Sequence, residues 1–343
     1  MMGFGACTPK SLMTILVTGG AGYIGSQAAH ALVDRGERVV VLDNLSTGVR
    51  EFAPKSARFI QGNAGSATLV RKIIREHNVS AVMHFAGSIV VPDSVRQPVE
   101  YYKNNTSVSR NLIEVCIAQN VRNFVFSSTA AVYGITRLAP VPEKAPTRPL
   151  SPYGRSKLMV EWMLEDAARA HDLRYIALRY FNVAGTDPFG RTGQPDRKIS
   201  HLIKSAARVA LGRAKHLDIF GTDYPTHDGT AVRDYIHVSD LVDAHLLSLD
   251  HLRNGGKAAV YNCGYGNGSS VLDVVTAFER VTKRRLPVRI APRRSGDAAF
   301  VVADPGRLRR TLGWVPRFNR LDTIVNSALE WERRLTTSSA RTA

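Results

Sequence analysis

A tyrosine and a lysine in the segment 153–157 are spaced so that they could share one proton-transfer step. Tyr153 and Lys157 are four residues apart, which places both side chains on one face of a helix. An ordinary phenol has a pKa of about 10 and is a poor base at neutral pH, but a neighbouring ammonium favours its ionised form. We therefore identify Tyr153 and Lys157 as candidate catalytic residues, with Tyr153 as acid and base. Such pairs also occur by chance, and the segment is equally typical of a helix start capped by Ser151, with Pro152 in the first turn.

Hydroxyl side chains stand at the end of a predicted strand at 123–127. Ser127, Ser128 and Thr129 follow one another there. In a parallel sheet, the carboxyl ends of the strands face the crevice in which ligands bind. Thr129 is therefore a candidate to bridge a substrate hydroxyl and Tyr153. A cluster of this kind also serves simply to satisfy its own backbone at a strand end.

Three glycines near the start of the chain are spaced for binding a pyrophosphate. Gly19, Gly22 and Gly25 lie between a predicted strand and a predicted helix. This arrangement lets the backbone approach the pyrophosphate and directs free N–H groups of the helix start toward it. Asp43 follows at the end of the next predicted strand, where a carboxylate accepts the ribose hydroxyls of adenosine and repels a 2′-phosphate. The pattern predicts a dinucleotide site that takes NAD rather than NADP.

The elements that must position these residues alternate along the chain. Apolar runs between helical patterns indicate a parallel sheet that is covered on both faces. We predict strands at 15–17, 38–42, 57–61, 81–85, 123–127 and 175–179, and helices at 24–34, 68–76 and 99–119.

The expected fold class is therefore α/β, a Rossmann-type doubly wound parallel sheet with a second, smaller mixed α/β domain for the substrate. We expect an N-terminal extension at 1–13, the NAD-binding domain at 14–185, the substrate domain at 186–335 and a flexible tail at 336–343. The chain is expected to return to the first domain around 235–251.

Length and composition limit the class of protein. A chain of 343 residues predicts about two domains and a core that needs neither a disulfide nor a metal. Its three cysteines form no disulfide or zinc pattern. No segment has the length of apolar sequence that a membrane span requires, and no signal peptide precedes the first strand. We expect a cytoplasmic protein without a bound metal and without a membrane partner.

The chain is strongly basic, with 46 Lys and Arg against 29 Asp and Glu and a net charge of +17. Such a balance invites a nucleic-acid partner. The basic residues are spread along the chain, however, and the denser stretches at 191–215 and 283–294 lack interleaved aromatic residues. We therefore expect no nucleic-acid partner, and interpret the charge as a solvated basic face or a local site for a small anion.

Taken in order, these motifs resemble those of the extended short-chain dehydrogenase/reductase family, and in particular of its nucleotide-sugar epimerases. The resemblance extends from about Thr14 to Trp331. The more specific strings that carry it lie at 42–46, 84–87, 101–105, 151–160, 179–182, 219–226 and 229–238.

The resemblance implies a role for each matching position. The residues that would hold NAD are Gly19, Gly22, Tyr23, Ile24, Gly25, Asp43, Asn44, Asn63, Ala64, Phe85, Ala86, Gly87, Asn104, Ser127, Tyr153, Lys157 and Tyr180. The residues that would hold a UDP-sugar are Thr129, Tyr153, Phe181, Asn182, His201, Leu202, Leu217, Phe220, Arg233, Arg294, Asp297 and Val301. Arg233 and Arg294 are suited to neutralise a diphosphate, although in so basic a chain each is also typical of a solvated surface charge.

The chain departs from the common epimerase pattern at four positions. Ile89 replaces a lysine that often contacts the cofactor, and Asn63 replaces an aspartate that contacts adenine. His201 replaces an asparagine beside the diphosphate, and Val301 replaces a tyrosine against the sugar.

The reaction implied by the resemblance is NAD-dependent inversion at C4 of a UDP-hexose through a 4-keto sugar, which interconverts UDP-glucose and UDP-galactose; N-acetyl sugars are additional candidate substrates. Alternatives are epimerisation of a UDP-pentose or UDP-uronate, net oxidation, 4,6-dehydration and a non-enzymatic NAD-binding role. Dehydration is disfavoured because alanines, not carboxylates, follow Thr129. The resemblance also implies a homodimer, packed through the helices at 99–119 and 151–169.

Overall fold

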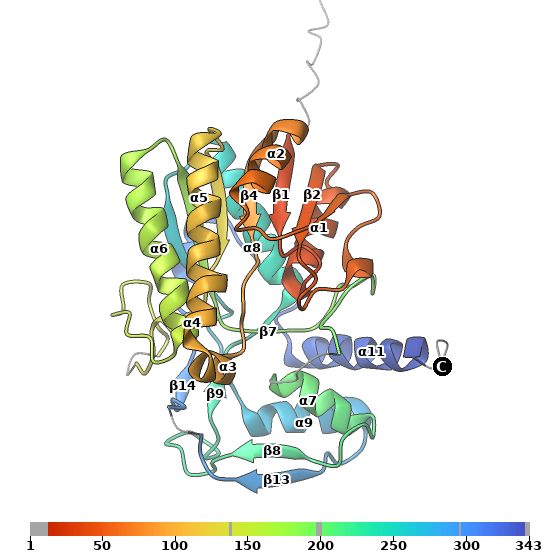
Figure 1. Cartoon of the computed structure of the whole chain (residues 1–343). Coiled ribbons are helices and arrows are strands. Elements are labelled where there is room, and N and C mark those ends of the chain that lie inside the picture. Colours follow the sequence, from red (N-terminus) through yellow and green to blue (C-terminus); the bar gives the residue numbers. More distant parts are fainter. Residues whose placement is uncertain (1–12, 137–138, 197–200, 295, 340–343) are drawn as a thin grey trace, which may run out of the picture.

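The largest unit of the protein is a parallel sheet of seven strands (Figure 1). The computed structural model describes residues 13–136, 139–196, 201–294 and 296–339, so most of the predicted extension and the last four residues lie outside the described chain. The strand order is β11-β6-β5-β4-β1-β2-β3. These strands are β1 (Thr14–Thr18), β2 (Arg38–Asp43), β3 (Arg58–Gln61), β4 (Val79–His84), β5 (Asn123–Ser127), β6 (Arg174–Tyr180) and β11 (Ala259–Cys263).

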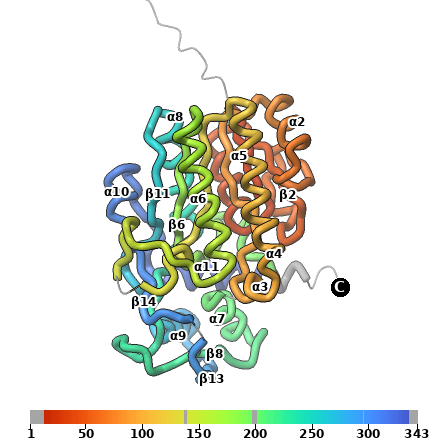
Figure 2. The backbone as a smooth tube through the Cα atoms, turned by 60° about the vertical axis from the view of Figure 1, so that its left-hand side comes forward, coloured from red at the N-terminus to blue at the C-terminus, as the bar shows by residue number. Residues whose placement is uncertain are grey.

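Apolar side chains on both faces of the strands explain why helices cover the sheet on two sides. One face, with Ile15 and Val17, packs on α1 (Tyr23–Asp34) and α8 (Val238–Arg253). The alternate residues, such as Leu16, pack on α2 (Ala67–His77), α5 (Val108–Ala118) and α6 (Pro152–Ala170). Figure 2 shows α5 and α6 side by side on one outer face. The Rossmann-type α/β architecture is confirmed.

A smaller part of the molecule lies beyond the carboxyl ends of the strands (Figure 1). Its strands are β7 (Asn182–Ala184) with β10 (Tyr235–His237), β8 (Leu217–Phe220) with β13 (Val288–Ala291), and β9 (Val232–Arg233) with β12 (Ser269–Ser270) and β14 (Phe300–Val301). Its helices are α7 (Leu202–Ala210), α9 (Val271–Thr282) and α11 (Leu321–Ser339). Helix α10 (Gly306–Leu312) instead packs beside β11 and α8 of the large unit (Figure 2).

Short helical segments connect these units. They are η1 (Arg50–Phe52), α3 (Val91–Arg96), α4 (Pro98–Tyr101), the π-helical segment η2 (Tyr102–Ser107) and η3 (Ala130–Val132). In the part of the chain that the structure describes, no helix has the length and apolarity needed to cross a membrane.

The six predicted strands and the three predicted helices are confirmed, although the helix predicted at 99–119 contains the π-helical segment. The seventh strand, β11, was not predicted. It pairs in parallel with β6, with Tyr261 opposite Leu178. Thus β11, which follows the first strands of the smaller part in sequence, completes the large sheet.

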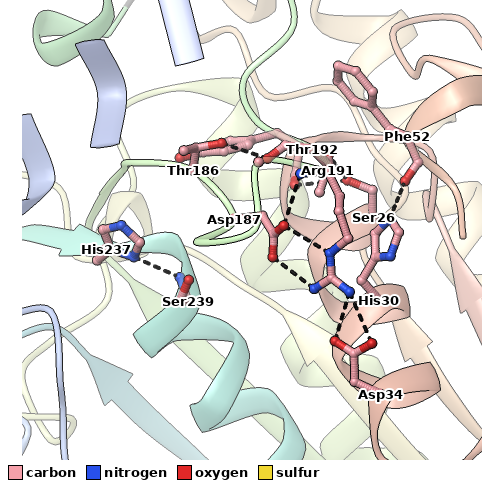
Figure 3. Close-up of polar contacts among 12 residues, drawn as sticks. Ser26, His30, Asp34, Phe52, Thr186, Asp187, Arg191, Thr192, His237 and Ser239 are labelled. Atoms are coloured by element: carbon pink, nitrogen blue, oxygen red, sulfur yellow. Dashed lines mark hydrogen bonds and ion pairs between the residues drawn. The ribbon is translucent and has the colours of Figure 1, made fainter. Parts of the chain in front are cut away.

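Polar contacts tie helix α1 to the segment that leads into the smaller part (Figure 3). The hydroxyls of Ser26 and Thr192 are 2.6 Å apart. Arg191 donates to the carboxylates of Asp187 and of Asp34, with N–O distances of 2.9 Å to each. These contacts hold the helix that follows the glycine-rich loop against residues 186–192.

Candidate active site

The residues after β5 and the first turn of α6 form one packed unit. Ser151 caps α6 by accepting a hydrogen bond from the N–H of Gly154. A Cβ on Gly154 would lie 2.7 Å from the carbonyl oxygen of Ala131, so only glycine permits this close approach of helix and turn. Tyr153 and Thr129 are hydrogen-bonded to each other. The structure therefore places the predicted acid/base beside the predicted bridging hydroxyl.

Lys157 lies one turn further along α6 and is almost fully buried, with 3% of its surface exposed. Its Nζ donates to the carbonyl oxygen of Ser127 at 3.0 Å and lies 4.9 Å from the ring centre of Phe126. Burial lowers the pKa of Lys157 to about 8. The ammonium is thus held at the carboxyl end of β5, next to the hydroxyl-bearing residues.

The predicted lowering of the pKa of Tyr153 by a neighbouring positive charge stays a prediction for the site with NAD bound. Among the groups of the chain itself, burial raises this pKa above its usual value, and Tyr180 raises it further, while the hydrogen bond with Thr129 opposes the rise. Desolvation favours the neutral phenol of a buried tyrosine. The phenol of Tyr153 is therefore protonated near neutral pH, and additional positive charge nearby would be needed to ionise it.

A buried ionic network supports this region from behind. Arg179 of β6 pairs with Glu161 of α6, and Glu161 also accepts a hydrogen bond from the hydroxyl of Ser128. Arg179 donates to the hydroxyl of Tyr133 at 2.9 Å. The sequence analysis did not identify these residues, since a buried ion pair has no signature in sequence spacing.

The glycine-rich loop has the geometry that a cofactor phosphate requires. Gly19 has a φ of 71°, and a Cβ there would lie 2.5 Å from the backbone N of Ala86. Gly22 occupies the N-cap position of α1, and no side chain forms a capping hydrogen bond there. The N–H groups of the first turn are consequently left without a side-chain partner, as an anion site needs. The hydroxyl of Tyr23 donates to the carbonyl of Gly185 at 2.6 Å, so this side chain ties the start of α1 to the segment at residue 185.

Asp43 stands at the end of β2, beside this loop. One of its carboxylate oxygens accepts from the N–H of Ala21 at 3.0 Å and the other from the N–H of Leu45 at 2.8 Å. Asn44 and Asn63 each accept from a backbone N–H two residues further on. The carboxylate of Asp43 is thereby oriented at the edge where an adenosine ribose would lie.

The two asparagines at 104 and 105 take different positions. Asn104 is exposed and only weakly joined to Ser88, with 3.4 Å between Nδ2 and Oγ. Asn105 is buried. Its amide oxygen accepts a hydrogen bond from the N–H of Ser88, and its amide nitrogen donates to the carbonyl of Ser88 and to the hydroxyl of Ser156. A Cβ on Gly87 would lie 3.0 Å from Asn105 Oδ1 and 3.5 Å from Lys157 Nζ. Asn105, which the sequence analysis missed, therefore fixes the loop after β4 against α6.

The remaining predicted cofactor residues line the same strand ends. Ser127 donates its hydroxyl to the hydroxyl of Tyr180 at 2.9 Å. Phe85 and Ala86 are half-buried at the end of β4, Ala64 is buried after β3, and Ile24 packs on the core from α1. The uncapped start of α1, the glycine cradle and the carboxylate of Asp43 fit NAD, with the pyrophosphate on the loop and the ribose on Asp43.

The residues predicted to hold UDP come from several segments of the smaller part. Phe220 ends β8 and carries the guanidinium of Arg294 over its ring at 3.7 Å. Arg233 donates to the carbonyls of Val232 and Ala298 at 2.9 and 2.8 Å and lies 3.5 Å from a carboxylate oxygen of Asp297. The structure thus gathers two arginines and one carboxylate around the end of β8.

The other residues predicted to hold UDP differ in their burial and in their hydrogen bonds. Leu217 is buried in the main core, so its side chain serves packing. His201 caps the start of α7 and leads into Leu202; burial and Lys204 lower the pKa of His201, which keeps its imidazole neutral near pH 7. Asn182 begins β7, where its N–H donates to the carbonyl of Asp234.

The sugar end is marked by Phe181 and Val301. Val301 packs against the cluster that contains Phe181 and Ala130, close to Thr129 in sequence. Its neighbour Phe300 is 38% exposed. Adjacent residues of a strand face opposite sides, so Val301 is the one of the two that faces the catalytic region.

One group of potential metal ligands lies in the described chain. His227, Asp228 and Asp273 bring ligand atoms within 4.8 Å of one another. Asp228 already accepts from Thr230 and Ser270, and Asp273 closes the capping box of α9. These bonds account for both carboxylates without an ion.

Residues 15–264 match the family described as "NAD dependent epimerase/dehydratase family". The chain belongs to this family. It is 56% identical to the UDP-glucose 4-epimerase of Azospirillum brasilense over 321 residues, and the aligned region covers 94% of this chain and 92% of that protein.

Two solved structures of epimerases have the same fold. A UDP-glucose 4-epimerase from Bifidobacterium longum in complex with NAD+ and UDP is 36% identical, with a TM-score of 0.87 over 94% of this chain and 98% of that one. The UDP-Glc/GlcNAc 4-epimerase of Campylobacter jejuni is 41% identical, with a TM-score of 0.83 over 94% and 99%. Membership of the NAD dependent epimerase/dehydratase family agrees with the site described above, in which a nucleotide cradle adjoins a tyrosine–lysine pair.

Proposed function

We propose that the protein is an NAD-dependent 4-epimerase that interconverts UDP-glucose and UDP-galactose. The proposal is carried by the 56% identity with a UDP-glucose 4-epimerase over 94% of the chain. The geometry supports it, because Lys157 reaches the carboxyl end of β5 from α6 and Tyr153 in the first turn of α6 interacts with Thr129.

Tyr153 would exchange the proton of the sugar 4-hydroxyl. Its phenol oxygen is hydrogen-bonded with Thr129, which can relay that proton or orient the hydroxyl. When bound, NAD supplies the reversible acceptor for the hydride at C4. The protein's part is to lower the pKa of a buried phenol, and the buried Lys157 ammonium, one helical turn after Tyr153 and held at the end of β5, supplies positive charge for this.

The 4-keto sugar must rotate within the pocket so that its opposite face meets the cofactor, because only then does the configuration at C4 invert. Arg233 and Arg294 would hold the diphosphate by charge-assisted hydrogen bonds while the sugar stays weakly bound. Around the sugar, Phe181 and Val301 offer apolar surface rather than hydrogen-bonding groups. A firmly held nucleotide with a loosely held hexose allows that rotation. Dehydration of the sugar is disfavoured, because Ala130 and Ala131 leave the turn after Thr129 without a carboxylate.

The reaction is tested by incubating the purified protein with UDP-glucose and with UDP-galactose, without added NAD. NMR of both mixtures should reach the same ratio of the two C4 epimers. Absence of inversion, or turnover that depends on free NAD, would contradict the proposal and favour a net oxidoreductase. UDP-N-acetylglucosamine, UDP-xylose and UDP-glucuronate in parallel define the sugars accepted.

We also propose a homodimer formed through α5 and α6, the neighbouring helices on one outer face (Figure 2). Trp162 of α6 is 53% exposed there, although a side chain of this size usually gains from burial. Light scattering should give twice the chain mass of 37.6 kDa, and Trp162→Glu should shift the protein toward the monomer. The two described cysteines, Cys116 and Cys263, are buried free thiols, in keeping with the cytoplasmic location that we propose.

A further inference from the structure

A tyrosine that the sequence analysis did not identify stands among the arginines of the candidate UDP site. Tyr224 lies in the loop between β8 and β9 and is 5% exposed. Its N–H donates to the carbonyl of Gly229 at 2.9 Å, and its carbonyl accepts from the N–H of Thr226. Both backbone groups are therefore used within the loop, so the position of the ring is well defined.

The ring of Tyr224 is packed tightly on two sides. The guanidinium of Arg293 lies 4.1 Å from its centre. Gly221 has a φ of 83°, and a Cβ there would lie 2.5 Å from Arg293 Cγ and 2.8 Å from Tyr224 Cε2. A glycine at 221 is what allows the arginine and the tyrosine to meet, so the ring cannot simply swing into solvent.

The hydroxyl of Tyr224 is buried and has no hydrogen-bond partner among the described residues. Three other buried tyrosines donate their hydroxyls within the chain. Tyr101 donates to Val90, Tyr133 to Asn262 and Tyr265 to Asp240. Because buried polar groups are nearly always hydrogen-bonded, the solitary hydroxyl of Tyr224 indicates a partner that is not part of the chain.

The surroundings indicate the chemistry of that partner. Burial and the Asp297 carboxylate raise the pKa of Tyr224, Arg293 and Arg233 oppose that rise, and Asp223 adds to it. The hydroxyl is therefore a neutral donor with two arginines and two carboxylates nearby. Arg233 and Asp297 belong to the candidate UDP site, and the N–H of Asp297 donates to the carbonyl of Arg294. An anionic ligand between these arginines would bring acceptor oxygens to a donor that has none.

We propose that the Tyr224 hydroxyl is a further substrate-binding group, donating a hydrogen bond to the nucleoside diphosphate alongside Arg233 and Arg294. The inference rests on the proposed function, in that it assigns one more contact to the UDP part of the substrate. It also explains why a tyrosine rather than a phenylalanine stands on Arg293.

The test is UDP binding by titration calorimetry to wild type and to Tyr224→Phe. Loss of a hydrogen bond to a charged oxygen should weaken UDP binding by about tenfold or more. The KM for UDP-glucose should rise by a similar factor, whereas the NAD content should stay unchanged. The melting temperature without UDP should not fall, because no hydrogen bond within the protein is lost.

Tyr265→Phe is the matched control. Its hydroxyl donates to Asp240 and accepts from the N–H of His237, so this variant should melt at a lower temperature and bind UDP as wild type does. UDP affinity of Tyr224→Phe within twofold of wild type would overturn the proposal. So would a loss of affinity accompanied by a fall in melting temperature like that of the control. If wild type neither binds UDP nor inverts UDP-glucose, the proposed function itself fails, which is a separate result.

Discussion

Glu161 of α6 and Arg179 of β6 form a buried ion pair behind the catalytic residues, with 2.6 Å between Oε2 and Nη2. Their side chains are only 4% and 8% exposed. Glu161 also accepts from the hydroxyl of Ser128, the residue before Thr129. Glu161 therefore joins the helix that carries Tyr153 both to β6, through Arg179, and to the end of β5, through Ser128.

Removing one partner of this pair should be costly. Glu161→Ala leaves the Arg179 guanidinium buried without its anion, so urea denaturation should show a loss of about 3–5 kcal/mol in the free energy of unfolding. Glu165→Ala is the control on the same helix, because the pair of Glu165 with Arg169 is exposed and should contribute less than ~1 kcal/mol. Equal losses in the two variants would show that Glu161 and Arg179 contribute no more than a surface pair.

Tyr153→Phe should abolish epimerisation while leaving NAD bound. Only the ionisable oxygen is removed, and general acid–base groups of this kind contribute about 10²–10⁴-fold to rate. The measurement is the C4 inversion rate, together with the nucleotide released on denaturation. Tyr175→Phe serves as the control, since Tyr175 lies at the opposite end of β6. Near wild-type activity of Tyr153→Phe would exclude it as the acid/base.

The buried ammonium of Lys157 should make stability depend on pH. Its pKa is about 8 in the folded protein, against about 10.4 in an unfolded chain. Below pH 8 both states carry the proton and folding bears the full cost of burying the charge, about 3 kcal/mol. As the pH rises from 8 to 10, the folded state loses its proton first and this cost disappears.

Lys157→Met reveals the effect by comparison. It should be more stable than wild type at pH 7.5, and the difference should shrink toward pH 9.5 in matched urea titrations. A difference that does not change with pH would mean that Lys157 does not titrate in this range. The same variant should catalyse epimerisation more slowly and only at higher pH, because it lacks the charge that favours the phenolate.

Asp43 should make the purified protein carry NAD and not NADP. Two like charges about 4 Å apart repel by about 1 kcal/mol even in water, and by more in a partly buried site, which predicts at least a fivefold preference. Chromatography of the nucleotide released on denaturation measures it. In Asp43→Ser the preference should fall. A wild-type protein that releases mainly NADP would contradict the assignment of Asp43.

Val301 should leave room for an N-acetyl group on the sugar. We expect wild type to invert UDP-N-acetylglucosamine as well as UDP-glucose, and Val301→Tyr to reduce the first activity by more than tenfold while largely sparing the second, because the ring fills the space. Phe300→Tyr is the matched control, since Phe300 is exposed beside it. If Val301→Tyr leaves both activities alike, Val301 does not gate the pocket.

Features that depend on local spacing were predictable from the sequence alone. Gly19, Gly22 and Gly25 follow a strand and open a helix, and Tyr153 and Lys157 are one turn apart on α6. Neighbours in the chain remain neighbours in space, so these motifs could be interpreted without knowing the fold. The parallel sheet was predictable for the same reason, because apolar strands alternating with helices admit few other arrangements.

Features that depend on residues far apart in the chain became clear only from the folded structure. The pairing of β11 with β6, the choice of Asn105 rather than Asn104 as the buried amide, and the ion pair of Glu161 with Arg179 all rest on burial. So does the pKa of Tyr153, which burial raises. Spacing shows which groups can meet along one element, whereas packing determines which of them lose water, and that loss sets their protonation and their need for a partner.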